Sequence, residues 1–230
     1  MTHAFGEVRA RTLREEVARR LRNAIVTGKL KPGDHLKEAE IGNQMSVSRS
    51  PVREALRELE QEGLVVGIPN QGSFVRVIDE QDVEEILTLR LALENLACRL
   101  VVERCKFERT DFDRLQGYIE QQREAIEAGD FDNLIRLDVE FHEFICMKSG
   151  YGRLLKMWRS LRGQIEFLMY HLFNLLDWIP ETVVSDHLEI VDALRQGDVS
   201  RCIQINNGVN SRVTDACFEI LSLMRNAEVN

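Results

Sequence analysis

The sequence lacks the features that would assign it to several large classes of protein. No apolar run approaches the roughly 20 residues that cross a bilayer, so we expect no transmembrane helix. Residues 1–17 contain no apolar core of the kind that a signal peptide requires. Internal repeats and low-complexity tracts are also absent. We therefore expect a cytoplasmic protein built from ordinary globular domains.

The cysteines exclude two further classes. They are five in number and widely spaced, and no CxxC pair is present, so neither a disulfide framework nor structural zinc is indicated. We expect them to be small buried side chains in a reducing compartment, at Cys98, Cys105, Cys146, Cys202 and Cys217. The 230 residues, 44% hydrophobic and 30% charged, suit one large domain or two modest ones.

The net charge of −8 would usually argue against a nucleic-acid binder, but its distribution is uneven. Residues 1–78 hold 13 Lys and Arg against 10 Asp and Glu, which gives +3. The remaining residues hold 17 against 28, which gives −11. A mildly basic N-terminal part on an acidic body is the asymmetry expected when one domain of two contacts DNA.

Residues 46–65, SVSRSPVREALRELEQEGLV, are the most informative stretch. Pro51 suits the first turn of a helix, where its missing N–H would have no partner, and Ser48 or Ser50 is expected to cap that start. Apolar residues then recur at helical spacing, at Val52, Ala55, Leu56, Leu59 and Leu64. Arginines occupy the opposite face, at 49, 53 and 57. Such a face suits a DNA major groove, and the alternative is an ordinary solvated amphipathic helix.

The flanking segments complete a winged helix-turn-helix. A first helix over residues 13–27 brings four apolar residues close to one face, at Leu13, Val17, Leu21 and Ile25. The other expected elements are a KPGD turn, a short helix over 37–44, and a hairpin formed by residues 64–66 and 74–77. Three helices and a hairpin in fewer than 80 residues predict a winged helix-turn-helix domain over residues 1–78.

The runs AIVTGKLKPGDHL, VSRSPVREALRELEQEGLV and QGSFVRV resemble the DNA-binding domain of the GntR family of bacterial transcription regulators. The resemblance covers the whole domain, including its loop lengths. It implies a homodimer, with each recognition helix in a major groove of operator DNA and each wing tip over a minor groove. Carried over by position, it assigns DNA contacts to Ser48, Arg49, Ser50, Arg53, Gln71 and Gly72.

One position departs from that pattern. Many members carry a base-contacting arginine in the second helix, where this chain has Ala39. The loss of one guanidinium should relax or change the reading of one operator position, which is worth about 1–3 kcal/mol of discrimination.

From Glu80 onward the sequence shows helical patterns and no convincing strand. Six helices are expected, over residues 81–104, 110–129, 130–149, 151–176, 180–196 and from 198 towards 224. Thr110 and Asp130 are the expected caps of the second and third helices, and Gly129 closes the second. The fold class is therefore mainly α: a winged helix-turn-helix followed by an all-α antiparallel bundle over residues 79–230.

The runs EILTLRLALENLACRLV, DVEFHEFI and DHLEIVDALRQGD resemble the FCD effector-binding domain of the FadR subfamily. This resemblance extends from residue 80 to the C-terminus. It implies a regulator whose affinity for operator DNA changes when a small carboxylate metabolite binds in the bundle. Release of DNA on binding, meaning repression, is the commoner arrangement in that subfamily.

Three side chains of the bundle suit a divalent metal such as zinc, nickel or manganese. Asp138 and His142 are four residues apart and share a helix face, and His187 lies near the start of another helix. Many FCD relatives use one Asp and three His, and the third His follows 22 residues after the position of His187. Here that position is Val209, which cannot coordinate; His171 is the candidate substitute.

A site without metal is equally compatible with these residues. Asp138, His142 and His187 would then form a hydrogen-bonded polar cluster that binds an organic effector. Arg90, a lone guanidinium on an apolar helix, would gain importance as a bidentate partner for the carboxylate of the effector. The alternative for Arg90 is an internal ion pair with Glu94, one turn on, or with Asp138.

Two other functions remain as alternatives to a ligand-responsive regulator. A constitutive DNA-binding regulator with a decayed pocket would be consistent with Val209. A metal-dependent hydrolase is disfavoured, because no nucleophile or general-base motif accompanies the Asp and His residues and a DNA reader would have no role. We therefore expect a regulator and not an enzyme.

Overall fold

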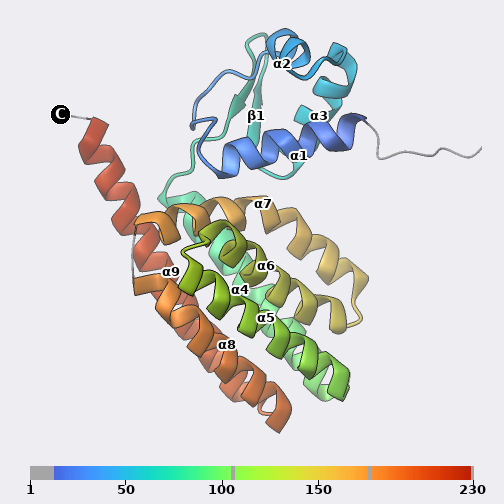
Figure 1. Ribbon diagram of the computed structural model, residues 1–230, viewed down its shortest axis with the longest axis vertical. Coiled ribbons are helices and arrows are strands. Elements are labelled where there is room, and N and C mark those ends of the chain that lie inside the picture. The colour runs from blue at the N-terminus through green and yellow to red at the C-terminus, as the bar shows by residue number, and fades with distance from the viewer. Residues whose placement is uncertain (1–12, 105–106, 176–177, 229–230) are drawn as a thin grey trace, which may run out of the picture. The chain divides into compact units, whose positions relative to one another are not determined.

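The computed structural model describes residues 13–104, 107–175 and 178–228 (Figure 1). Cys105, and residue 176 at the expected end of a helix, lie outside these ranges. The chain divides into two compact units, Met1–Val77 and Ile78–Asn230. The first contains a small two-stranded sheet and the second is helical, so the predicted mainly α fold class is confirmed.

The N-terminal unit is a three-helix winged fold. Its elements are α1 (Leu13–Val26), α2 (Glu38–Met45), α3 (Arg49–Gln61), β1 (Val65–Ile68) and β2 (Gly72–Val75). The strands pair antiparallel with Val65 opposite Val75, and Asn70, with a φ of 63°, lies in the turn between them. The tight turn from α2 into α3 passes through Ser46, which is left-handed with a φ of 55°. This turn places the N-terminus of α3 on the surface.

The core of this unit lies between α1 and α3. Its buried side chains are Val17, Ala18, Leu21 and Ile25 of α1 and Val52, Ala55, Leu56 and Leu59 of α3. Two expectations need correction. Leu13 begins the predicted apolar face but is 64% exposed, and the first buried side chain of α1 is that of Val17. Ser48 occupies the N-cap position of α3, yet its hydroxyl makes no capping hydrogen bond.

The described part of the C-terminal unit contains six helices, in agreement with the predicted bundle (Figure 1). They are α4 (Glu80–Glu103), α5 (Arg109–Ala128), α6 (Phe131–Lys148), α7 (Gly152–Leu175), α8 (Trp178–Gln196) and α9 (Val199–Glu228). Helix α4 packs against α6, α7 and α9, while α5 packs against α6 and α8. The core includes Trp158 of α7 and Phe141 of α6, both fully buried.

Local sequence sets most helix ends. Asp130 caps α6 by accepting a hydrogen bond from the backbone N–H of Asn133, and Gly129 ends α5 with a φ of 67°, both as predicted. The start of α5 differs from the prediction of a Thr110 cap. The helix begins at Arg109 because the Asp111 carboxylate accepts the backbone N–H of Glu108 at 3.0 Å.

Two further expectations concern the burial of the cysteines and the length of apolar helices. Cys98, Cys146, Cys202 and Cys217 are buried and unpaired, as predicted. Among the residues that the structure describes, no helix is both long and apolar enough to cross a membrane.

Gly117 within α5 and Gly129 directly after it give a matched test of backbone conformation. A Cβ at Gly117 or Gly129 would meet nothing within 4 Å, but Gly129 alone has a positive φ. Gly117→Ala should stabilise the helical unit by about 0.5–1 kcal/mol, and Gly129→Ala should destabilise it by about 1 kcal/mol. Urea unfolding followed by tryptophan fluorescence measures this unit, since Trp158 and Trp178 both belong to it. Equal effects of the two substitutions would contradict the left-handed conformation of Gly129 and the helical conformation of Gly117.

Candidate functional site

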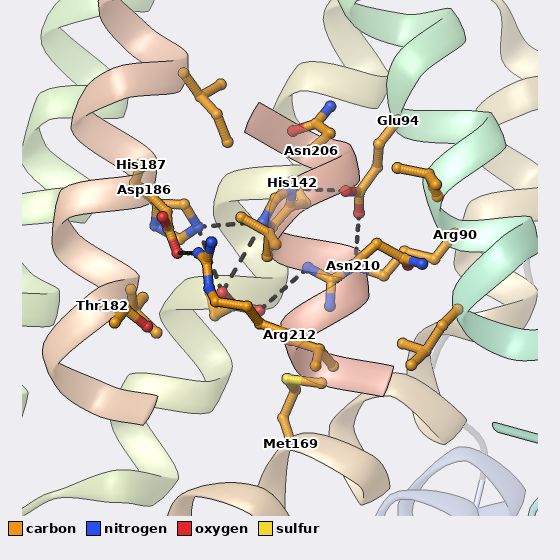
Figure 2. Close-up of a pocket in the computed structure, with 17 residues that line it drawn as sticks. Arg90, Glu94, His142, Met169, Thr182, Asp186, His187, Asn206, Asn210 and Arg212 are labelled. Carbon is orange, nitrogen blue, oxygen red and sulfur yellow. Dashed lines mark hydrogen bonds and ion pairs between the residues drawn. The ribbon is translucent and has the colours of Figure 1, made fainter. Parts of the chain in front are cut away.

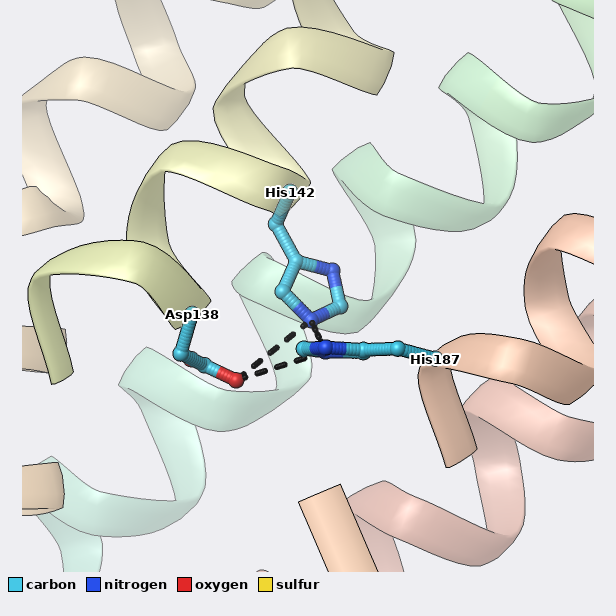
Figure 3. Close-up of side chains that lie close together, drawn as sticks. All are labelled: Asp138, His142 and His187. Atoms are coloured by element: carbon cyan, nitrogen blue, oxygen red, sulfur yellow. Dashed lines mark hydrogen bonds and ion pairs between the residues drawn. The ribbon is translucent and has the colours of Figure 1, made fainter. Parts of the chain in front are cut away.

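The structure brings together the three side chains proposed from the sequence as metal ligands. Asp138 and His142 project from α6, and His187 projects from α8 to meet them (Figure 3). Their ligand atoms lie within 4.8 Å of one another, and all three residues are buried. The Nε2 atoms of the two imidazoles are 3.1 Å apart, and Asp138 Oδ1 lies 3.4 Å from His187 Nε2 and 3.9 Å from His142 Nε2.

The other nitrogen of each imidazole faces an acceptor. Glu94 Oε2 is 3.0 Å from His142 Nδ1, and Gln122 Oε1 is 2.8 Å from His187 Nδ1. Burial raises the pKa of Glu94, but Arg90 and His142 outweigh it and lower the pKa to about 2, so this carboxylate is ionised and accepts only. With the proton on Nδ1 of each ring, both Nε2 atoms present lone pairs to the Asp138 carboxylate and to each other.

This convergence of lone pairs fits a cation. Burial lowers the pKa of His187, which keeps the ring neutral at pH 7. Burial raises the pKa of Asp138, but the Arg90 charge opposes this effect, and so does a hydrogen bond from His187 when that ring carries its proton on Nε2. The pKa is held below its usual range, so the carboxylate is ionised. Ligand atoms on a tetrahedral zinc with bonds of 2.0–2.1 Å are about 3.3 Å apart, close to the separations found here. The donor set therefore suits a divalent metal.

Glu94 organises the wall beside these ligands. Its Oε1 accepts hydrogen bonds from Arg90 Nε at 2.8 Å and from the indole N–H of the buried Trp158 at 3.1 Å. Sequence reasoning placed Glu94 only as a partner of Arg90 and did not predict its contact with His142. Gln122 of α5 was not predicted at all, although it is fully buried. A buried glutamine on a helix without a neighbouring motif gives no recognisable signal in one sequence.

Arg90 makes the internal ion pairs that were the alternative to an effector anchor. Besides its bond to Glu94, its Nη2 lies 3.5 Å from Asp138 Oδ2. Arg90 also lines the pocket that opens beside the cluster (Figure 2). Its guanidinium has five N–H donors, so these two contacts do not use its full capacity.

The pocket shows what replaces the third histidine. Val209 lines it, as do Asn206 and Asn210 (Figure 2). The suggested substitute, His171, is wrong: it does not join the cluster of ligand atoms or line this pocket. Its ring packs instead between Phe167 and Tyr170 of the same helix, at centroid distances of 4.4 and 5.7 Å.

The rest of the pocket is apolar apart from Thr182 and one charged pair. Apolar side chains line it at Leu87, Leu91, Met169, Val183, Ile190 and Val213. Arg212 of α9 pairs with Asp186 of α8 at 2.6 Å, and both line the pocket. Together with Arg90, Glu94 and Asp138, the lining carries three carboxylates against two guanidinium groups. Its formal charge is therefore −1 without a bound cation.

The residues proposed to contact DNA lie at two exposed points of the N-terminal unit. Ser48, Arg49 and Ser50 surround the start of α3 and are exposed, and Arg53 follows on the same helix. The wing turn carries the other two residues, Gln71 and Gly72, which are also exposed.

Comparison with known proteins assigns both units. Residues 13–75 match the bacterial regulatory proteins of the gntR family, and residues 85–206 match the FCD domain. The chain belongs to the GntR family of transcription regulators. It is 32% identical over 192 residues to the "Probable D-xylose utilization operon transcriptional repressor" of Paenarthrobacter nicotinovorans, covering 82% of this chain and 83% of that protein.

Two further relatives extend the comparison. The transcriptional repressor RspR of Escherichia coli is 29% identical over 184 residues, covering 80% of this chain and 79% of its own length. A crystal structure of a GntR regulator from Rhodococcus sp. RHA1 superposes with a TM-score of 0.72 at 26% identity, covering 91% of this chain and 97% of that one. This GntR-family protein is therefore a DNA-binding transcription regulator and not an enzyme.

The buried Glu94 provides a stability test of the regulator. Glu94→Gln should lower the free energy of unfolding of the helical unit by about 3 kcal/mol, because Arg90 would remain charged and buried with one carboxylate fewer. The exposed Glu120 is the matched control, and Glu120→Gln should change stability by less than about 0.5 kcal/mol. Urea unfolding by circular dichroism with chelator present measures both. A Glu94→Gln protein as stable as the control would show that Arg90 does not depend on Glu94.

Proposed function

We propose that this regulator is a cytoplasmic homodimeric repressor that is released from its operator when a small carboxylate metabolite binds at a metal in the helical unit. Its family membership supports the DNA-binding half of this proposal. The observation that carries the effector half is the pair of histidine Nε2 atoms, 3.1 Å apart, that lie beside the ionised Asp138 carboxylate.

The DNA-reading half rests on the start of α3. Arg49 and Arg53 lie four residues apart on its exposed side, and Ser48 and Ser50 flank the first of them. Arginine forks distinguish guanine in the major groove, while hydroxyls hold phosphates and fix the register. Gln71 and Gly72 at the wing turn would contact the adjacent minor groove. A dimer would place two such faces on an operator with twofold symmetry.

Arg49→Ala and Arg53→Ala should each abolish sequence-specific binding and leave the fold intact, because each removes a base-reading fork. Arg19→Ala is the control, since Arg19 is exposed to a similar extent as Arg53 and, like it, pairs with a glutamate, but lies on α1. Gel-shift titration against a DNA site selected by the wild-type protein, with a competitor duplex, measures the difference. Wild-type affinity in either α3 variant would remove that arginine from the reading face.

The helical half rests on the ligand geometry. Asp138, His142 and His187 would hold the metal, and Glu94 and Gln122 would orient the two rings. A bound divalent cation supplies a Lewis acid that binds anionic oxygen. The three protein ligands leave positions for the effector, and Val209 adds none.

The charge of the pocket favours a carboxylate effector once metal is present. A divalent cation would change the formal charge of the lining from −1 to +1. Arg90 and Arg212 then add donors on two sides of the pocket, and the apolar side chains would accept the rest of the molecule. Without metal, an anionic effector would enter a pocket of its own sign, which is unfavourable.

Helix α4 provides the route from effector to DNA. It carries Arg90 and Glu94, and it begins at Glu80, five residues after β2 ends at Val75. Effector binding would shift α4, and this shift would change the relative position of the two winged units in a dimer. Two of the relatives are named as transcriptional repressors, which supports repression as the mode of regulation.

Two alternatives make different predictions. A metal-free cluster would hold its protons internally, with His187 Nε2–H donated to Asp138 at 3.4 Å and the Gln122 amide turned over. Arg90 would then be the main anchor of an organic effector. A constitutive regulator with a decayed pocket predicts that neither metal nor metabolite changes operator affinity.

Metal content separates these possibilities. Protein prepared without chelator or a polyhistidine tag should contain about one divalent metal per chain by elemental mass spectrometry. His142→Ala should lose that metal, because it removes a ligand, while His171→Ala should retain it, because His171 lies outside the cluster. Absence of metal after soaking wild-type protein with zinc, nickel and manganese would overturn the metal proposal and leave the cluster and Arg90 as the anchor.

A further inference from the structure

A carboxylate on α2 holds one of the proposed DNA-reading arginines. Glu38 Oε1 accepts from Arg53 Nε, and Glu38 Oε2 accepts from Arg53 Nη2, both at 2.7 Å. This is a bidentate pair between planar groups, which fixes the guanidinium in orientation as well as in position. The Arg53 side chain remains 55% exposed, so the pair does not hide it from solvent.

The pair leaves a particular part of Arg53 available. Nε and one N–H of Nη2 are directed at Glu38, so the remaining donors are both N–H groups of Nη1 and the second of Nη2. These donors form the end of the guanidinium fork. Two adjacent donors of this kind match the O6 and N7 acceptors of guanine in the major groove.

Without the pair, Arg53 would have no fixed direction. An exposed arginine samples many rotamers, and a phosphate oxygen attracts it as well as a base edge does, without regard to sequence. Helix α2, with the sequence EAEIGNQM, contains no basic residue. Glu38 is therefore the side chain of α2 that contacts Arg53 and orients it.

We propose that Glu38 is a specificity-determining residue that positions Arg53 to read guanine. This inference rests on the proposed contact of Arg53 with DNA. Glu38 itself need not touch a base: its role is to fix the arginine before binding, so that less conformational entropy is lost in the complex. The hydrogen bond from Arg53 lowers the pKa of Glu38, which keeps the carboxylate ionised at neutral pH.

Glu40 offers a matched control. It lies in the same first turn of α2, carries the same charge and pairs with Lys37 at 2.8 Å instead of with an α3 arginine. Glu38→Gln and Glu40→Gln therefore remove equal charge from the same helix turn. Any general gain in attraction to the phosphate backbone should be shared by both variants.

The experiment selects binding sites for the full-length protein from randomised double-stranded DNA and then measures affinity for each single-base variant of the selected site. Wild-type protein, Glu38→Gln, Glu40→Gln and Arg53→Ala are compared, and thermal melting confirms that each is folded. We expect Glu38→Gln to lose about tenfold discrimination at one base pair per half-site and to keep the wild-type preferences elsewhere, whereas Arg53→Ala should lose sequence preference altogether. Glu40→Gln should keep the wild-type preference at every position.

Two outcomes would overturn the role of Glu38 itself. One is a Glu38→Gln variant that keeps every wild-type base preference although Arg53→Ala has lost its own. The other is tighter and equally selective binding by Glu38→Gln but not by Glu40→Gln, which would mean that Glu38 competes with DNA for Arg53. If Arg53→Ala keeps every wild-type preference, the proposed reading role of Arg53 fails, and the inference fails with it for that separate reason.

Discussion

The ionised Glu94 carboxylate is the group on which the helical unit depends. It accepts hydrogen bonds from Arg90, Trp158 and His142, which come from α4, α7 and α6. A buried charge or polar group is costly unless it is paired. Without Glu94, the buried guanidinium would lose an ion pair, and the indole and imidazole N–H groups would lose their acceptor. One group therefore joins the packing of three helices, neutralises a buried guanidinium and sets the tautomer of a proposed metal ligand.

Sequence predicted what depends on local spacing and missed what depends on packing between helices. The winged fold, the bundle and the Gly129 and Asp130 helix ends follow from period, turn and capping rules. The shared face of Asp138 and His142 follows from their spacing of four residues. The contacts of Glu94 with His142 and of Gln122 with His187 join helices far apart in the chain. A single Glu or Gln on a helix does not indicate in the sequence which residue it will contact.

The misplaced ligand shows the same limit. In the sequence, His171 is the candidate substitute for the histidine missing at Val209. Residue spacing predicts which side chains share one face of a helix. It does not predict how α7 is rotated about its axis, and this rotation decides which of its faces meets the neighbouring helices. That rotation is set by large buried residues such as Trp158 and Leu172, and it leaves the His171 ring beside Phe167. The wall at Val209 remains without a third imidazole.

The two proposed sites use one physical device in different surroundings. Glu38 fixes a cationic side chain on the surface, and Glu94 fixes a guanidinium and an imidazole in the interior. Salt at physiological strength screens charges over about 8 Å, so it weakens the exposed pair and its attraction to DNA but affects the buried network little. DNA affinity should therefore respond to ionic strength more steeply than effector affinity does. That difference lets the helical unit keep its ligand geometry under conditions in which the winged unit releases DNA.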